Sequence, residues 1–455
     1  MDRRKLLQWS GAASALGAAT ALPERAAAAP ASPSTSALGL DAAQMGVRPG
    51  SPDDQSAPLQ RAIDRAAAAR VPLALPPGVY RVAALKLPAG AQVIGMRGAT
   101  RLVYGGGASL FGAEHADQIS LTGLTIDGMK RQLPPHEGLV HFEACRGARI
   151  ADCAILGAGG HGILLAASEG EVTGSTIADA ADVALFTYDA AGLAIHRNTI
   201  ANAGNNGIQI IRSTAGHDGT LVFDNRIENT NNRAGGSGQY GNAINAHRAG
   251  DVIVRGNIIR QCAFSAIRGN SASNIQIVGN TVHQAGEVAL YSEFGFEGAI
   301  IAHNMVDGAQ TGISVANFNE GGRLAVVQGN ILRNLKPKDP DPPPGDLWGV
   351  GIYVEADTAV SANVVENARD AGIAIGWVSF LRDVAVTGNV VRQAPIGIAV
   401  SVVPGAGSAL ISANVVTGFR RGAIVGMDHA RPITGDLAKG AQPHAHLSIA
   451  DNRIG

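Results

Sequence analysis

The chain has 455 residues, of which 46% are hydrophobic and only 16% are charged. Its 36 lysines and arginines nearly balance its 37 aspartates and glutamates, which argues against a nucleic-acid partner. Three cysteines without metal-ligand spacing argue against a disulfide framework, and 59 glycines indicate many tight turns.

The first 29 residues have the pattern of an export signal. Arg3 and Arg4 precede a short, mildly apolar run that ends at Leu22, and small residues follow at 26–29. We expect residues 1–29 to be a twin-arginine signal peptide, removed on export to the periplasm or beyond. Because the run is short and rich in Ala and Gly, we expect no stable membrane insertion after cleavage.

Residues 30–70 are expected to form a linker and then a helix. The predicted helix spans residues 55–70, with Asp53 or Asp54 near its N-cap. Its apolar residues, including Leu59, recur at helical spacing. We expect this helix to cap the end of a stack of strands, whose open edges would otherwise invite aggregation.

Residues 71–455 repeat at intervals of mostly 22–27 residues, and each repeat carries a polar residue at the same position. Apolar residues alternate with a period of two, as at Ile275 and Ile277, which predicts strands. Stacked asparagine amides donate to and accept from one another, so they satisfy their own hydrogen bonds when buried. The pattern predicts an all-β solenoid, a single-stranded parallel β-helix. The predicted ladder residues are Asp127, Cys153, Ser175, Asn198, Asn225, Asn257, Asn280, Asn304, Asn330, Asn363, Asn389, Asn414 and Asn452.

The segment from Leu75 to Gly95 carries a more specific likeness. It begins Leu-Pro-Pro-Gly-Val-Tyr and ends Val-Ile-Gly, after the acidic pair Asp53-Asp54 and the Ala-rich helix. This arrangement resembles the N-terminal module of the pectate-lyase-like β-helix superfamily, many of whose members cut, epimerise or bind polysaccharides. The resemblance implies a right-handed β-helix and a polysaccharide partner. With its leader and its asparagine repeats, the chain also resembles a family of exported repeat proteins whose activity is not established.

Two insertions, residues 230–241 and 336–347, interrupt the repeat. Each lies between a ladder asparagine and the next strand, so both leave the solenoid from the same edge. The strands that follow them, at Ile244 and Ile352, are four coils apart, or about 19 Å at ~4.8 Å per coil. We expect the two insertions to form the walls of a groove.

Polar and aromatic residues concentrate at the outward positions of the coils between Gln209 and Glu355. This clustering predicts a binding surface; a merely polar outer face is the alternative. The predicted substrate-binding residues are Gln209, Arg212, Asn245, Arg248, Asn270, Ser314, Asn317, Tyr353 and Asp357.

The same surface suggests two kinds of chemistry. A lyase or epimerase that acts on an acidic polysaccharide neutralises a uronate carboxylate, removes the neighbouring proton and returns a proton. His247, Arg268 and Tyr291 have side chains suited to these steps and lie on consecutive coils. Arg268 suits the carboxylate, because the planar fork of an arginine binds two carboxylate oxygens. Glu293 and Glu355 are two coils apart, or about 9.6 Å, near the ~6.5–9.5 Å separation of an inverting glycoside hydrolase. These five are the predicted catalytic residues.

A non-catalytic glycan-binding or cell-envelope scaffold protein is the alternative to an enzyme, because familiar catalytic signatures are incomplete. Residues 160–162 resemble a polygalacturonase motif that lacks its aspartates, and residues 135–137 resemble a mannuronan epimerase motif that lacks its leading Asp. His444 and His446, with His429, have the right type for metal binding, but a solvated loop is the simpler interpretation. We predict no metal site and no cofactor, and the oligomeric state stays open.

Overall fold

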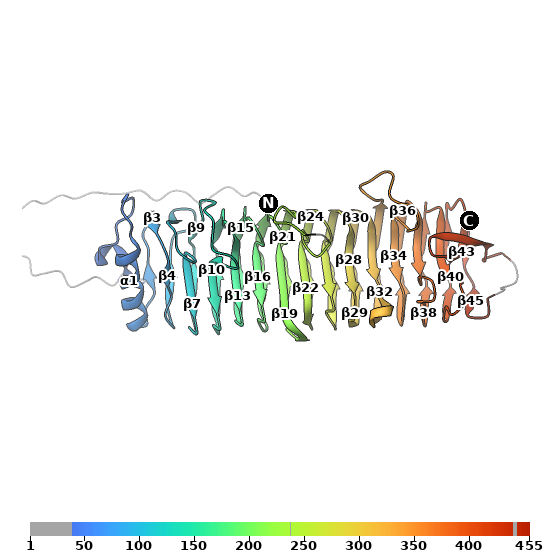
Figure 1. Ribbon diagram of the computed structural model, residues 1–455, viewed down its shortest axis with the longest axis horizontal. Helices are drawn as coiled ribbons and strands as arrows, with labels where there is room; N and C mark the ends of the chain where they lie inside the picture. Colours follow the sequence, from blue (N-terminus) through green and yellow to red (C-terminus); the bar gives the residue numbers. More distant parts are fainter. Residues whose placement is uncertain (1–38, 237, 440–443) are drawn as a thin grey trace, which may run out of the picture. The chain divides into compact units, whose positions relative to one another are not determined.

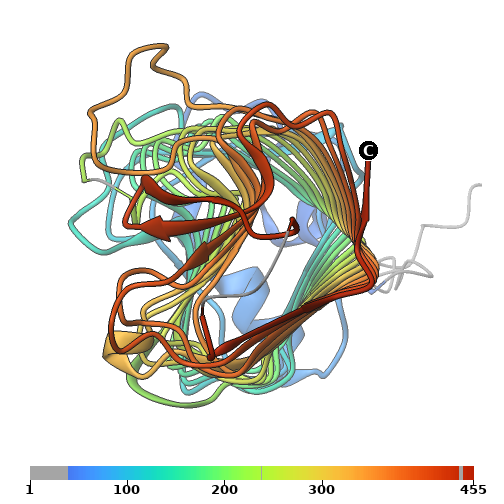
Figure 2. The same ribbon diagram turned by 90° about the vertical axis from the view of Figure 1, so that its right-hand side faces the viewer.

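The computed structural model describes residues 39–236, 238–439 and 444–455, so the predicted signal peptide lies outside the described residues. The described chain winds into a solenoid with three sheets of 16, 15 and 15 strands, which are parallel except at one terminal strand (Figure 1). Each sheet takes every third strand of the coiled region, so each coil contributes one strand to each sheet. Seen along the stack, successive coils lie over one another (Figure 2). The predicted β-helix is confirmed.

The sheet that carries the predicted site, which we call the site sheet, has 15 strands. In order they are β4 (Leu85–Lys86), β7 (Phe111–Glu114), β10 (Gly138–Glu143), β13 (His161–Ala166), β16 (Leu185–Tyr188), β19 (Ile208–His217), β22 (Ile244–Gly250), β25 (Ile267–Asn270), β28 (Val288–Glu293), β31 (Thr311–Val315), β34 (Val350–Val354), β37 (Ala371–Ile375), β40 (Ile396–Ser401), β43 (Gly422–Asp428) and β44 (Arg431–Asp436).

The other two sheets are named by their first strands. The β3 sheet runs from β3 (Gly78–Val82) to β46 (Arg453–Ile454), and its strands begin directly after the ladder residues. The β1 sheet runs from β1 (Leu40–Asp41) to β45 (Leu447–Ala450). Inward side chains of all three sheets are almost wholly apolar, and this continuous core supplies most of the hydrophobic stabilisation.

Helix α1 (Ser56–Ala68) packs at the N-terminal end against β2 (Leu73–Ala74), β4 and β5 (Gln92–Ile94). Its buried residues, which include Leu59 and Ile63, form the predicted apolar stripe. Asp54 Oδ1 accepts a hydrogen bond from Ser56 N (2.9 Å), just before the helix begins. No helix of residues 39–236, 238–439 and 444–455 is long and apolar enough to cross a membrane.

The asparagine ladder runs unbroken from Asn198 to Asn452. In a typical step, Asn280 Nδ2 donates to Asn304 Oδ1 on the next coil (3.0 Å) and to Val254 O (3.0 Å). Cys153 and Ser175 extend the column, since Cys153 N donates to Ser175 Oγ (3.1 Å). Each amide therefore satisfies backbone and side-chain groups that would otherwise be buried without partners.

The assignment of Asp127 to the ladder is wrong. Asp127 pairs in register with Leu156 and binds Arg101 through its carboxylate. Leu124 occupies the ladder position instead, because Ala154 N donates to Leu124 O as Thr176 N donates to Cys153 O on the next coil. Because Leu124 is apolar, a search for polar residues at this position selects the nearby Asp127 instead.

The C-terminal end of the site sheet is closed by a hairpin. Strand β44 pairs antiparallel with β43, whereas the other paired strands of the described residues are parallel. Asp436 accepts hydrogen bonds from Ala423 N and Ile424 N, both at 3.1 Å. Residues 431–436 thus cover the last parallel strand of this sheet.

Candidate functional site

The predicted outward residues form two rows on the site sheet. The register from β19 to β34 places one residue of the first row on each coil: Gln209, Asn245, Arg268, Tyr291, Ser314 and Tyr353. In the second row, His247 pairs with Asn270, which pairs with Glu293. The alternation read from the sequence therefore gives the correct register for these residues.

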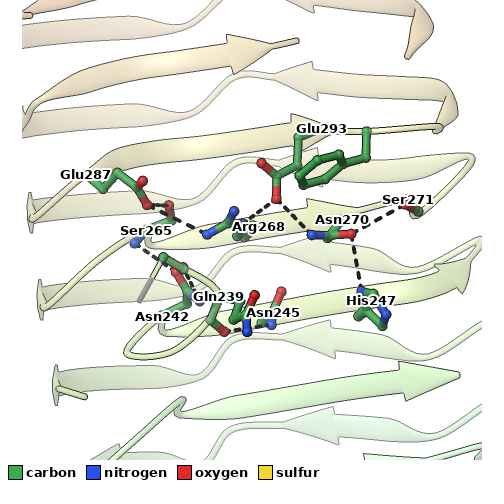
Figure 3. A network of polar contacts seen from close by, with 12 residues as sticks. Gln239, Asn242, Asn245, His247, Ser265, Arg268, Asn270, Ser271, Glu287 and Glu293 are labelled. Carbon is green, nitrogen blue, oxygen red and sulfur yellow. Dashed lines mark hydrogen bonds and ion pairs between the residues drawn. The ribbon is translucent and has the colours of Figure 1, made fainter. Parts of the chain in front are cut away.

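Four of these residues are joined in one hydrogen-bonded chain (Figure 3). Arg268 Nε donates to Glu293 Oε1 at 2.6 Å, and Asn270 Nδ2 donates to the same oxygen at 3.0 Å. Asn270 Oδ1 lies 3.2 Å from His247 Nδ1. We call Arg268, Glu293, Asn270 and His247 the relay, since each side chain is held by the next.

The first insertion covers part of this face. Gln239 O accepts a hydrogen bond from Asn245 Nδ2 (3.1 Å), and Gly238 lies so close to Arg268 that a Cβ there would be 2.8 Å from Nη1. As a result Asn245, Arg268 and Glu293 are only 3%, 8% and 2% exposed. The expectation that these residues face open solvent is wrong: they point outward, but the loop and the neighbouring side chains cover them.

The buried ion pair is only partly compensated. Arg268 Nη1 lies 3.8 Å from Glu287 Oε2 and has no hydrogen-bond partner, although it is buried. The Tyr291 ring lies 5.2 Å from the guanidinium carbon and offers a cation–π contact. Burial raises the pKa of Glu287, and the charge of Arg268 partly opposes that shift. An unsatisfied guanidinium nitrogen is a costly feature that a bound anion would relieve.

His247 is half-buried, as is Asn270 beside it. Burial and then the positive charge of Arg248 lower its pKa, so its imidazole is neutral at neutral pH. Glu293 can only accept, so the Asn270 amide must turn its nitrogen to Glu293 and its oxygen to His247. The hydrogen-bond network therefore assigns the proton to Nδ1 of His247 and leaves Nε2 with a free lone pair.

Tyr353 and Glu355 form a separate pair. Tyr353 Oη donates to Glu355 Oε1 at 2.5 Å, and Phe318 N donates to Glu355 Oε2 at 2.6 Å. Burial raises the pKa of Glu355, while burial and the neighbouring carboxylate raise the pKa of Tyr353. The coil of Ser314 lies between this pair and the relay, so Glu293 and Glu355 belong to different networks.

Several predicted binding residues point elsewhere. Arg212 Nη1 donates to Ala190 O (3.2 Å), and Arg248 Nη1 donates to Ser213 O (3.0 Å). Asn317 Oδ1 accepts from Phe294 N (3.2 Å) beside the Glu355 pair. These three side chains are thus occupied in contacts with neighbouring backbone.

The prediction that Asp357 joins the groove is wrong. Its carboxylate accepts two hydrogen bonds from Arg382 (2.8 and 2.6 Å) and one from Arg323 (3.5 Å). These hydrogen bonds hold its pKa below the usual range. Asp357 lines a cavity of about 620 Å³ beside the β1 sheet, because the chain has already turned away from the site sheet there.

The structure adds residues that the alternation did not predict. Glu287 and Ser265 precede their strands, yet they reach the relay through Arg268, and Ser265 Oγ donates to Glu287 Oε2 (3.1 Å). Gln239 and Gly238 come from the insertion. Residues just ahead of the strands and residues of the insertion fall outside the alternation rule, although the insertion itself was an available signal.

The two insertions do leave from one edge, between the β3 sheet and the site sheet. The second reaches back toward the first: Lys338 Nζ donates to Ala263 O (3.2 Å). A cavity of about 550 Å³ lies between them and is lined by Thr230, Gln261 and Lys336 among others. The walls therefore border a hollow at the sheet edge, which no residue of the relay lines.

Within the described ranges, no group of three His, Cys, Asp or Glu side chains is placed to hold a metal ion. The ring of His429 lies against Trp377 (5.3 Å), whereas His444 and His446 lie against each other (5.8 Å). The three histidines thus do not form one ligand set.

The sequence matches the family model described as "Right handed beta helix region" over residues 107–238 and 215–391, more than half of the chain. A comparison with curated proteins found no match. Among solved structures, the chain is similar to the catalytic unit of the thermostable GH87 alpha-1,3-glucanase from Streptomyces thermodiastaticus strain HF3-3. The TM-score is 0.50 at 14% identity, over 93% of this chain and 69% of that one.

A second similar structure is the N-terminal fragment of bacteriophage Phi29 gene product 12, with a TM-score of 0.52 at 14% identity, over 91% of this chain and 72% of that one. The pre-mature form of gene product 12 gives a TM-score of 0.56 at 15% identity, over 88% of this chain and 58% of that one. Identities this low establish a common fold and nothing about activity. Together with the family match and the stacked parallel coils, they identify the chain as a member of the right-handed β-helix family.

Proposed function

We propose that the chain binds an acidic polysaccharide on the site sheet and acts on it as a lyase or epimerase. The observation that carries this proposal is the relay, which fixes the tautomer of His247. With its Nδ1 proton held by Asn270, the imidazole presents Nε2 as a general base. Its lowered pKa keeps it unprotonated at neutral pH.

Arg268 and Tyr291 supply the other two requirements. Arg268 has a buried nitrogen without a hydrogen-bond partner, which a uronate carboxylate would occupy once the loop at 238–239 moves aside. Burial and the charge of Glu293 raise the pKa of Tyr291, so the phenol stays protonated at neutral pH. A base, an acid and a cation thus lie on three consecutive coils, β22, β25 and β28.

His247, Arg268 and Tyr291 together account for the protons and the charge in the proposed reaction. His247 Nε2 takes the proton beside the uronate carboxylate, and Arg268 stabilises the charge that builds on that carboxylate. For a lyase, the electron pair forms a carbon–carbon double bond while the glycosidic oxygen leaves with a proton from Tyr291. For an epimerase, Tyr291 gives its proton to the opposite face of the same carbon.

An inverting hydrolase is the alternative that the raised pKa of Glu355 favours, because a general acid needs a protonated carboxyl. Its partner Glu293 is less suited to activate water, since it is 2% exposed and paired with Arg268. A non-catalytic glycan-binding or cell-envelope scaffold protein is the remaining alternative, and it predicts binding without turnover.

A turnover screen separates these functions. Purified protein is incubated with alginate, pectate and hyaluronan, and unsaturated product, C5 inversion and reducing ends are measured. We expect unsaturated product or inversion, which His247→Gln lowers by at least about 10²-fold, in keeping with the loss of a general base. The matched control, His283→Gln, changes a half-buried histidine of the β3 sheet and leaves the rate unchanged. Reducing ends alone would favour the hydrolase, and binding without product would favour the scaffold.

We also propose that the protein is exported by the twin-arginine pathway to the periplasm or beyond. The proposal rests on Arg3, Arg4 and the small residues at 26–29. Fractionation of cells that express the chain and its Arg3→Lys/Arg4→Lys variant tests it: only the parent chain is expected outside the cytoplasm.

A further inference from the structure

Five basic residues gather on the C-terminal coils, away from the relay. Arg369 lies between β36 (Val364–Ala368) and β37, and Arg420 and Arg421 lie between β42 (Val415–Thr417) and β43. Backbone hydrogen bonds stack these turns, since Arg369 N donates to Leu335 O (3.0 Å) and Arg421 N donates to Pro395 O (2.9 Å). The turn of Pro395 lies between that of Arg369 and that of Arg420 and Arg421, so the three arginines lie on two turns, two coils apart, at one edge, where Lys336 and Lys338 join them.

Two adjoining cavities open among these side chains. One of about 740 Å³ is lined by Lys336, Lys338, Arg369 and Arg420, with Asp339 as its acidic residue. The other, of about 480 Å³, shares Arg369 and Arg420 and adds Arg421, with Asp346 and Asp370. Five cations thus surround the joint hollow against three carboxylates, in a chain whose formal charge is −1.

The arginines are free to bind a ligand. Within the described residues, the guanidinium groups of Arg369, Arg420 and Arg421 make no hydrogen bond or salt bridge, and all three residues are exposed. Asp370, whose carboxylate feels the charges of Arg369 and Arg421, is already engaged: its Oδ2 accepts from Trp348 N at 2.7 Å, just after the second insertion. Two upstream turns at the same edge carry the acidic residues Asp182 and Glu287.

We infer that Arg369, Arg420 and Arg421 form a second site, which binds anionic groups of a saccharide chain whose carboxylates or sulfates enter the joint hollow. Planar guanidinium forks bind two oxygens of such groups at once, and a concave site with several of them favours a chain over a single ion. The site begins at the coil of β37, three coils or about 14 Å beyond that of Glu293. It rests on the proposed function and deepens it, since one extended chain would contact both sites.

Titration calorimetry on the full chain tests the inference. The probes are a uronate hexamer, a uronate dimer, a sulfated hexamer, a neutral hexamer, inorganic sulfate and a single-stranded DNA of equal charge. The test variant is Arg369→Ala/Arg420→Ala/Arg421→Ala. The matched control, Arg333→Ala/Arg392→Ala/Arg453→Ala, removes three exposed arginines from the β3 sheet and its last coil.

We expect the test variant to bind the anionic hexamers about tenfold more weakly, whereas the control changes by less than twofold and neither variant alters the dimer's affinity. A loss confined to the uronate or to the sulfated hexamer identifies the anion. The inference is overturned if both variants lose hexamer affinity equally, or if the test variant weakens the binding of inorganic sulfate alone. It is also overturned if DNA binds more tightly than either hexamer. If the hexamer's affinity depends on the three arginines but no uronate is turned over and Arg268→Ala leaves binding unchanged, the proposed function fails while this site stands.

Discussion

Arg268 and Glu293 form an ion pair of 2.6 Å on the outer face of the solenoid, yet both residues are less than one-tenth exposed. A buried pair of this kind contributes little net stability but is costly to break, because either partner alone is left as an uncompensated charge. The pair is better understood as a positioning device: Glu293 also fixes the amide of Asn270 and, through it, the imidazole of His247.

Breaking this ion pair is expected to be costly. Glu293→Leu should lower the free energy of unfolding by about 3–5 kcal/mol, since it strands the guanidinium of Arg268. The double variant Arg268→Met/Glu293→Leu should recover most of that loss, because no unpaired charge remains. Urea denaturation measures both. Arg333→Met, which breaks an exposed pair with Asp307 (2.9 Å), should cost no more than about 1 kcal/mol. Equal losses in all three variants would contradict this account.

The ladder makes a second prediction. Asn280→Ala removes the amide that donates to Asn304 Oδ1 and Val254 O, and it strands acceptors and donors on both neighbouring coils. We expect a loss of about 2–4 kcal/mol in the free energy of unfolding, since each buried unsatisfied group costs about 1–3 kcal/mol. Asn229→Ala, an exposed asparagine bonded to Asn202, serves as the control and should cost under about 1 kcal/mol. Urea unfolding compares the two.

Glu355 predicts a dependence of stability on pH. Its folded pKa is raised above the ordinary value of 4.5 by burial, so in the window above pH 4.5 the folded state binds more protons than the unfolded state. Stability therefore falls as pH rises from 4.5 through the folded pKa, and the loss persists above it. Glu355→Gln should flatten this fall, whereas Glu169→Gln, at an exposed carboxyl, should not. The free energy of unfolding measured from pH 4 to 8 distinguishes them, and an unchanged slope for Glu355→Gln would exclude the assignment.

His247 predicts a spectroscopic signature. Nitrogen NMR should find the Nδ1-protonated tautomer and a pKa below 6.5, since burial and Arg248 both disfavour the charged ring. Asn270→Ala removes the acceptor at Nδ1 and should redistribute the proton toward Nε2. Glu293→Gln should act in the same direction, because a glutamine no longer dictates which way Asn270 faces. If the tautomer ratio of His247 is unchanged in both variants, the assignment of His247 as a base loses its support.

How far the sequence predicts the site can be judged from single residues. The period of two places Asn245, Arg268 and Tyr291 in one row correctly, because parallel coils keep a strict register. The same rule fails for Asp357, which lies past β34, and for Arg248, which lies within β22. Both have a positive φ (48° and 57°), so the backbone turns there and side-chain direction no longer follows alternation. Burial escaped prediction as well, because it depends on where residues 238–241 fold back, and that is a tertiary contact.

The ladder shows a similar boundary. Asn198 to Asn452 could be placed from spacing alone, since each asparagine marks its own turn. Asp127 could not, because an aspartate three residues away imitated the missing polar residue while Leu124 filled the position with an apolar one. The repeat can therefore be located from the sequence where every ladder position carries a polar residue. Its register becomes ambiguous where a coil has an apolar residue at that position.

The uniform ladder has a consequence for how such a chain can change length. Each rung bonds only to the rungs directly above and below, so a whole turn excised between two asparagines would let the remaining rungs rejoin with the same geometry. A single inserted residue inside a strand would instead reverse the facing of everything up to the next corner. The distance between the Arg268–Glu293 pair and the C-terminal arginines can thus change in steps of one coil. Such steps would let related proteins match saccharide chains of different repeat length.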